Sequence, residues 1–280
     1  MQKNIQKYFA LFALPTLIAF GISFVVPFVL GVYLSFTEFT TVTNAKWVGF
    51  SNYTKVFSDQ DFLNALWFTL KFTVISVLSI NIFAFLLALL LTRGIRGTNL
   101  YRTVFFMPNL IGGIVLGYIW QLILNGILFK FDVTLTFSPT YGFWGLIILT
   151  NWQLIGYMMV IYIAGLQNVP KDLIEAAKID GATRFGILKN VTMPLVMPSI
   201  TICLFLTLSN SFKLFDSNLA LTAGAPSKQT TMLALDIYNT FYGKAGWEGV
   251  GQAKAVIFFV MVALIVLVQL LITRRKEVEG

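Results

Sequence analysis

The stretch Glu175–Pro194 reads EAAKIDGATRFGILKNVTMP and carries five charged residues, in a chain of which only 11% of the residues are charged. Long apolar runs flank it on both sides. Pro170 suits the first turn of a helix, where its missing N–H costs no hydrogen bond, and Gly181 suits the C′ position that ends one. The spacing therefore predicts a helix of about ten residues between them, followed by a second short helix with Thr183 as its N-cap.

A helix of this length is marginal in water by itself, so it needs something to pack against. Its charged face carries Glu175 between two lysines, and its apolar side chains are Leu173, Ala177 and Ile179. We expect the packing partner to be another protein. A solvated connector between two apolar runs is the alternative.

The composition of the whole chain indicates a membrane protein, because 57% of its 280 residues are hydrophobic and its mean hydropathy is +0.80. Six apolar stretches are long enough to cross a bilayer as helices. They run over residues 8–36, 66–91, 104–129, 144–166, 196–214 and 255–273. The sequence predicts an all-α integral membrane protein with a single domain over residues 1–280 and six transmembrane helices. Its first span is a retained anchor, because no small-residue cleavage site follows it.

The cationic residues predict the orientation of these spans. Four segments on one side of a six-span topology hold most of them: Lys3 and Lys7; Arg93, Arg96 and Arg102; Lys171, Lys178, Arg184 and Lys189; and Arg274, Arg275 and Lys276. The longer opposite loops hold only Lys46, Lys55, Lys130, Lys228 and Lys244. By the positive-inside rule, both termini and the loop 167–195 between the fourth and fifth spans lie in the cytoplasm.

Several kinds of chemistry are excluded by the residues the chain lacks. It contains no histidine, so it predicts no histidine-based metal site, catalytic triad or proton relay. Cys203 is the only cysteine and is expected to be a small packing residue. No ionisable acid or base lies within most of the apolar runs, and Lys71 and Lys213 are placed near outer span ends, where they can extend to the headgroups. We predict no catalytic residue and no metal site.

Uncharged polar residues form two stripes inside the fourth and fifth spans. Gln153 and Tyr157 are four residues apart and share a helix face, while Thr207, Asn210 and Ser211 recur at intervals of three and four. Hydrogen bonding between helices explains such residues taken singly. Together the stripes favour a pathway for a neutral, hydroxyl-rich solute, because amides, hydroxyls and aromatic faces bind such molecules without charge.

Small residues in the third run predict close helix packing. Gly113 and Gly117 form a small-xxx-small pair, the spacing at which two helix backbones approach closely. Pro108 lies just before them and could bend or break the helix.

The opening stretch resembles the EAA loop of binding-protein-dependent ABC importer permeases, which has the form EAA-x3-G-x9-I-x-L-P and lies between the fourth and fifth spans. Val191 and Met193 replace the Ile and Leu of that pattern. Three further stretches resemble the carbohydrate-uptake branch of the family, and within it the first permease subunit of the maltose-transporter type. These are GFSNYTKVFSDQDFLNALWFTL at 49–70, YRTVFFMPNLIGGIVLGYIWQLIL at 101–124 and LTAGAP at 221–226.

The resemblance implies a type I ABC importer permease fold, a bacterial cytoplasmic membrane location and a cytoplasmic coupling helix that docks on a separate ATPase. The implied coupling residues are Glu175, Ala176, Ala177, Asp180 and Gly181. The implied partners are a second permease subunit, two copies of the ATPase and an external sugar-binding protein. The chain itself has no G-x-x-x-x-G-K-[ST] phosphate loop, so ATP and Mg are expected on the ATPase and no cofactor on this chain.

The resemblance also bears on the polar stripes. The family's sugar-contacting positions fall at Tyr157, which lies in a YMM segment shared with the maltose type, and at Thr207, Asn210 and Ser211, which are placed by counting back from LTAGAP. Gln153 joins them by sharing the helix face of Tyr157.

Other functions stay open at this point. The same permease could carry another neutral polar solute such as a polyol, or a glycerol phosphodiester. A stand-alone channel or secondary carrier should contain internal repeats or intramembrane charges, and neither is evident in the sequence. An integral membrane enzyme should place carboxylate pairs or histidines at the interface, whereas Asp172, Glu175 and Asp180 are explained more simply by the helix they flank.

Overall fold

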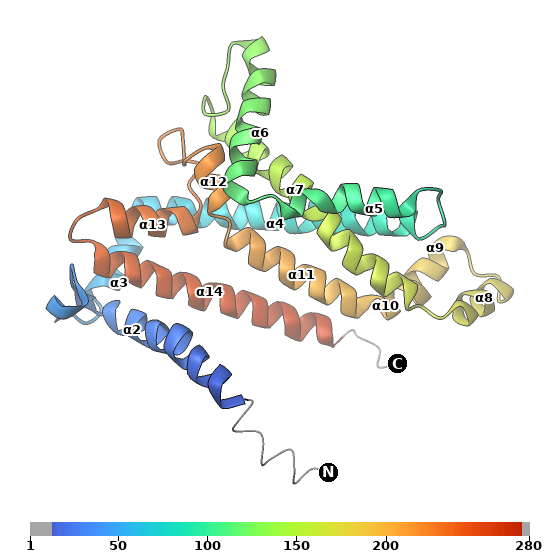
Figure 1. Ribbon diagram of the computed structural model, residues 1–280, viewed down its shortest axis with the longest axis horizontal. Helices are drawn as coiled ribbons and strands as arrows, with labels where there is room; N and C mark the ends of the chain where they lie inside the picture. The colour runs from blue at the N-terminus through green and yellow to red at the C-terminus, as the bar shows by residue number, and fades with distance from the viewer. Residues whose placement is uncertain (1–12, 276–280) are drawn as a thin grey trace, which may run out of the picture. The chain divides into compact units, whose positions relative to one another are not determined.

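The structure is a computed structural model that describes residues 13–275 (Figure 1). The predicted first span begins at residue 8, so its start lies outside the described residues, as do Lys3, Lys7 and Lys276. The chain forms two compact units. One comprises the residues up to Gln60 together with Ile237–Val260, and the other comprises Asp61–Asp236 together with the residues from Met261 onward. Helices make up most of both units.

The first unit contains the N-terminal apolar helix, and a small group of short strands and helices follows it. The chain is helical from Ala13 to Leu34, and this stretch includes a π-helical turn, η1 (Gly21–Val25), and α2 (Val26–Leu34). The remaining elements are β1 (Thr37–Glu38), the 3-10 turn η2 (Val42–Asn44), β2 (Lys46–Trp47) and α3 (Ser51–Ser58). The two strands are antiparallel, with Thr37 opposite Trp47. Asn52 fixes α3 to this turn, because its Nδ2 donates hydrogen bonds to the carbonyl oxygens of Ser35 and Thr37 at 3.0 and 2.8 Å.

A buried ion pair holds the first unit together. Lys254 is fully buried, and its Nζ lies 2.8 Å from Asp59 Oδ2 and 2.8 Å from Thr240 Oγ1. The second cation near this carboxylate is Lys244, whose Nζ lies 3.7 Å from Asp59 Oδ2 and whose side chain is 33% exposed. The sequence pattern does not indicate this pair, because Lys254 and Asp59 are far apart in the chain.

Lys254→Met is therefore expected to destabilise the protein by about 1–3 kcal/mol, since it removes the nearer, fully buried cation and leaves the Asp59 carboxylate only the longer contact with Lys244. Lys244→Met is the matched control and should cost less than about 1 kcal/mol, because that lysine is partly solvated. Thermal unfolding in detergent measures both. Equal stability of the two variants would contradict the assigned role of Lys254.

The second unit contains the long helices. Its elements are α4 (Gln60–Leu91), α5 (Thr98–Phe106), η3 (Met107–Leu110), α6 (Gly113–Leu128), η4 (Phe129–Phe131), α7 (Pro139–Gln167), α8 (Lys171–Ile179), α9 (Arg184–Ile187), η5 (Leu188–Thr192), α10 (Met193–Leu195), α11 (Met197–Phe212) and α12 (Asp216–Leu221). Two further helices, α13 (Leu233–Gly243) and α14 (Glu248–Arg274), contribute residues to both units.

Among the described residues, five helices are long and apolar enough to cross a membrane, or six if the bent pair Arg184–Leu195 and Met197–Phe212 counts as one span. The bend between these two segments is 70°. The count of six therefore stays a prediction, while the mostly helical, multi-span architecture is as the sequence predicted. Three predicted spans begin earlier in the structure, because α4 starts at Gln60, α7 at Pro139 and α14 at Glu248.

The third predicted span is not one helix. After α5, the chain forms the 3-10 turn η3 around Pro108, and Ile111 and Gly112 are extended before α6 begins. Proline has no backbone N–H to continue the hydrogen-bond ladder of a helix, so α5 ends just before Pro108. The predicted run 104–129 therefore combines the end of one helix with the whole of the next.

Two hydrophobic clusters form the core of the second unit. The first joins α4, α7 and α11 and includes Ala84, Ala88 and Cys203, all fully buried. Small side chains at such positions let helix backbones approach closely. Cys203 is a buried, unpaired packing residue, as expected. The second cluster joins α4, α6 and α7 around Phe72 and Leu146.

Gly113 and Gly117 bring α6 against α12, which confirms the close approach predicted from their spacing. A Cβ added at Gly117 would lie 2.5 Å from Ala220 Cβ, and one added at Gly113 would lie 2.8 Å from Asp216 Cβ. The short helix α12 is thereby held beside the start of α6. This contact places Asp216 and Ser217 at the site described below.

Candidate functional site

The segment between α7 and α11 forms two short helices that lie together beyond the ends of α7 and α10 in the second unit (Figure 1). Gly181 ends α8 in a left-handed conformation, with φ of +79°. The N–H of Ala182 donates to the carbonyl of Ala177 at 2.9 Å, and that of Gly181 donates to the carbonyl of Lys178 at 3.1 Å. This is a Schellman motif with Gly181 at C′. Thr183 then caps α9, its hydroxyl accepting from the N–H of Gly186 at 3.1 Å.

The outer surface of this segment is unusually apolar for a hydrophilic loop. Ile179 is 86% exposed and Phe185 72% exposed, and Leu173 is also exposed. The apolar side chain that α8 turns inward is Ile174, which packs against the α4–α7–α11 cluster. Leu173 and Ile179, two of the three apolar side chains expected to pack against a partner, are exposed in this chain, whereas the inward-facing Ile174 was not among the residues expected.

The predicted coupling residues lie on this same surface. Glu175, Ala176, Asp180 and Gly181 are exposed, and Ala177 is half-buried. Within residues 13–275 no ion pair joins Glu175 to a cation. Because large apolar side chains rimmed by polar ones mark protein interaction sites, the arrangement favours docking of a protein on α8.

A polar cavity of about 530 Å³ lies among η3, α6, α7, α11 and the start of α12. Its polar lining residues are Asn109, Thr150, Gln153, Tyr157, Asn210, Lys213, Asp216 and Ser217. The break between α5 and α6 lies beside this site, where the Nε2 of Gln153 donates to the carbonyl of Ile111 at 3.4 Å. Phe106 packs edge-on against Tyr157, with ring centroids 6.3 Å apart.

Three of the five predicted pathway residues line this cavity: Gln153, Tyr157 and Asn210. The other two lie elsewhere. Thr207 is fully buried and accepts a hydrogen bond from Asn81 Nδ2 at 2.9 Å, while Tyr162 donates to Asn81 Oδ1 at 2.6 Å. Thr207 thus belongs to a polar network that joins α4, α7 and α11.

Ser211 is also fully buried, and its Oγ has no hydrogen-bond partner among the described residues. Helical residues one position apart point in directions about 100° apart. Asn210 can therefore face the cavity while Ser211 faces the core.

The cavity contains two charged residues that sequence analysis did not assign to it. Lys213 was expected to extend to the headgroups, but α11 ends at Phe212 and Lys213 lies at its C-cap, where it lines the cavity. Asp216 follows at the start of α12. No ion pair joins these two side chains in the part of the chain that the structure describes. The sequence feature that indicates this position of Lys213 is its spacing of three residues from Asn210, because residues at that spacing lie on one helix face.

The arrangement offers the groups that bind a polar solute. Amide, phenol and hydroxyl groups offer donors and acceptors, Lys213 is a strong donor and Asp216 a strong acceptor. No group of three or more Asp, Glu or Cys residues among those described could hold a metal ion. A cavity of this size and polarity, surrounded by apolar membrane helices, fits solute passage.

Apolar spans, a polar cavity between the helices and an exposed loop with outward-facing apolar side chains are typical of one class, the multi-pass subunits of membrane transporters. The chain belongs to the family of binding-protein-dependent transport system inner membrane components, whose sequence model matches residues 80–278. The members of this family are transport subunits.

Known proteins resemble the chain over nearly its full length. It is 46% identical to a "Probable starch degradation products transport system permease protein" of Thermoanaerobacterium thermosulfurigenes, over 97% of this chain and 96% of that protein. It is 30% identical to a trehalose/maltose transport system permease protein of Thermococcus litoralis, over 86% of this chain and 84% of that protein.

A solved structure shares the fold. A chain of a bacterial alginate ABC transporter, crystallised in complex with an alginate pentasaccharide-bound periplasmic protein, matches with a TM-score of 0.81 at 22% identity, over 100% of this chain and 99% of that one. The fold is thus that of a type I ABC importer permease, as the resemblance implied.

Proposed function

We propose that this chain is the transmembrane permease subunit of an ATP-driven ABC importer that takes up a sugar or oligosaccharide. The observation that carries the proposal is the polar cavity, in which Gln153, Tyr157 and Asn210 meet within a helical membrane unit. Sugar hydroxyls need many donors and acceptors, and an aromatic ring complements the apolar face of a sugar ring. The names of the two permease relatives, which refer to starch degradation products and to trehalose and maltose, support a carbohydrate.

ATP hydrolysis takes place on a partner. The chain works as a single permease domain over residues 1–280, paired with a second permease subunit, two copies of an ABC ATPase that bind ATP and Mg, and an external sugar-binding protein. The alginate transporter crystallised with its periplasmic protein supports such a partner. Closure of the ATPase dimer moves α8 through Glu175, Ala176, Ala177, Asp180 and Gly181, and the permease pair alternates between inward-open and outward-open states.

The subunit lies in the bacterial cytoplasmic membrane with both termini in the cytoplasm. Arg93, Arg96 and Arg102 between α4 and α5, and the cations of the α8 segment, then share the cytoplasmic side. This topology places the exposed surface of α8 where an ATPase can reach it.

Lys213 favours a second candidate substrate. A cation in the cavity suits a solute with a phosphodiester, such as a glycerol phosphodiester, because charge-assisted hydrogen bonds to phosphate oxygens are strong. Asp216 also lines the cavity, and its negative charge offsets that of Lys213. The cavity as a whole therefore favours a neutral sugar. Competition for uptake between a malto-oligosaccharide and a glycerophosphodiester separates the two.

Tyr157→Ala and Asn210→Ala are expected to raise the KM for sugar uptake by about threefold to tenfold, the effect of losing one hydrogen bond. Ser209→Ala is the matched control, since Ser209 adjoins Asn210 but does not line the cavity. Uptake of radiolabelled sugar by vesicles that contain the complete transporter measures all three. Unchanged KM in both cavity variants would remove these residues from the pathway.

A further inference from the structure

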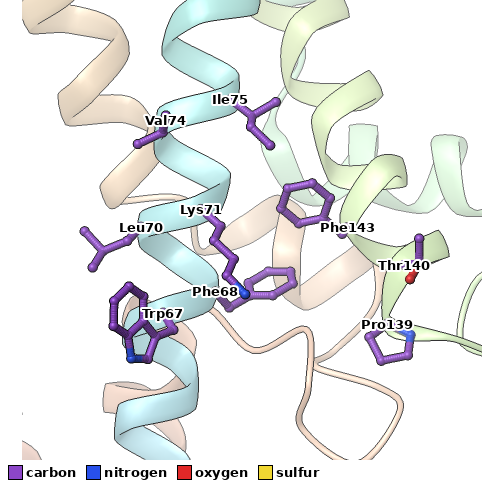
Figure 2. A pocket seen from close by; sticks show the side chains of 9 residues that line it. All are labelled: Trp67, Phe68, Leu70, Lys71, Val74, Ile75, Pro139, Thr140 and Phe143. Carbon is purple, nitrogen blue, oxygen red and sulfur yellow. The ribbon is translucent and has the colours of Figure 1, made fainter.

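A second cavity, of about 600 Å³, lies between α4 and α7 of the second unit. Its walls are almost entirely carbon: Trp67, Phe68, Leu70, Val74 and Ile75 from α4, and Pro139 and Phe143 from α7. Figure 2 shows Phe143 and Thr140 of α7 across the groove from the Lys71 side chain of α4. The rings of Phe68 and Phe143 meet edge-on at 5.7 Å and connect the two helices.

Lys71 is the only charged residue that lines this groove. It is exposed, and no carboxylate among residues 13–275 forms an ion pair with it. Thr140 supplies the one hydroxyl group of the lining, and its side chain is exposed as well. The groove thus has a cationic, hydrogen-bonding site next to a long apolar surface.

The depth of Lys71 in the membrane follows from α4 itself. Lys71 lies about 20 residues before Leu91, the last residue of α4. At a rise of 1.5 Å per residue, this distance along the helix is about 30 Å. That is the thickness of the hydrocarbon core, and the stretch between the two residues contains no charged side chain. Arg93 follows at the other end. With Arg93 at the inner headgroups, Lys71 lies at the outer ones.

The aromatic residues around the groove agree with this depth. Trp67 is 63% exposed and Trp144 50% exposed, and tryptophan is enriched at the membrane–water interface. Val74 and Ile75 lie one helical turn further along α4, toward the middle of the bilayer. The polar end of the groove therefore faces the headgroups, and its apolar end continues into the acyl region.

We propose that this groove binds a phospholipid of the outer leaflet, with the lipid phosphate on Lys71 and Thr140 and one acyl chain along Val74, Ile75 and Phe143. A membrane lipid matches both halves of the groove at once: an anionic phosphate for the unpaired cation, and a hydrocarbon chain for the aromatic and aliphatic wall. The proposal depends on the membrane orientation given above but not on the transported solute.

The test places the photoreactive residue p-benzoylphenylalanine at Val74 in the complete transporter, reconstituted in phosphatidylglycerol vesicles or in vesicles of an uncharged diacylglycerol glycolipid. Irradiation and mass spectrometry identify what is cross-linked. In phosphatidylglycerol the adduct should be the phospholipid. Lys71→Gln should lower the yield of this adduct by about fivefold, because one cation near an anionic lipid surface strengthens binding by about that factor. Lys55→Gln, which removes an exposed lysine outside the groove, should leave the yield unchanged.

The glycolipid and a second probe position complete the design. In glycolipid vesicles, Lys71→Gln should have no effect, since there is no phosphate to lose. A probe at Leu86, which is exposed deeper on α4, reports bulk lipid and should be insensitive to Lys71. A protein adduct at Val74, from the second permease or another copy of this chain, would overturn the proposal. So would a lipid adduct whose yield is the same with and without Lys71.

Discussion

Glu175→Lys and Gly181→Val should abolish ATP-driven uptake while the chain still inserts and folds. Glu175 is exposed on α8 and has no ion-pair partner within the described chain, so its charge is available to a cation of the ATPase. Loss of one member of a charge pair buried at an interface costs about 2–5 kcal/mol, which weakens association about thirtyfold or more. Reversal of the charge adds repulsion to that loss.

Gly181→Val acts through the backbone. Gly181 has φ of +79°, and a β-branched residue in that conformation is strained, even though a Cβ at this position meets no other atom within 4 Å. The Schellman motif should open and α8 should lose the orientation that presents Ile179 and Glu175. Co-purification of the ATPase and sugar-stimulated ATP hydrolysis measure both variants.

Lys130→Glu is the matched control for charge reversal, because Lys130 is exposed on a loop predicted to lie on the other side of the membrane. It should leave ATPase association and uptake unchanged. Normal ATPase binding by both Glu175→Lys and Gly181→Val would contradict the assignment of α8 as the coupling helix.

Gly156→Leu should prevent the second unit from folding. A Cβ added at Gly156 on α7 would overlap the backbone carbonyl of Phe105 at the end of α5, and backbone cannot move aside as a side chain can. Overpacking of a core costs about 1–3 kcal/mol where neighbouring side chains can adjust, so a clash with backbone should exceed that range. The variant should give little monodisperse protein in size-exclusion chromatography after extraction in detergent.

Gly126→Leu is its control, since a Cβ at Gly126 meets nothing within 4 Å. The control should yield folded protein in normal amount. The contact at Gly156 also bears on function, because α5 leads directly into the turn that carries Asn109 to the cavity beside Gln153 and Tyr157. A well-folded Gly156→Leu protein would mean that α5 and α7 do not meet closely in the membrane.

The features that could be predicted from the sequence depend on residues close together in the chain. Apolar runs long enough to span a bilayer predicted the long helices, and the position of Gly181 after an amphipathic segment predicted the end of α8. The Gly113 and Gly117 spacing predicted a close helix contact, which α12 makes. Gln153 and Tyr157 both line the cavity because residues four apart share a helix face.

The remaining features depend on contacts between residues distant in the sequence. The Lys254–Asp59 pair joins residues 195 positions apart, and hydropathy cannot reveal such a pairing. Thr207 and Asn210 have the same polar character, yet only packing decides that one joins Asn81 and the other faces the cavity. Lys213 was assigned to the headgroups because the end of α11 and the turn into α12 carry no clear sequence signal.

The central claim is that this chain provides a pathway whose driving force comes from a separate ATPase. The most direct test is solute uptake into vesicles containing the two permease subunits and the binding protein, with and without the ATPase, in the presence of ATP and Mg. The account predicts concentrative uptake only when the ATPase is present, and its loss in Glu175→Lys. Sustained uptake by the permease pair without the ATPase would contradict the account.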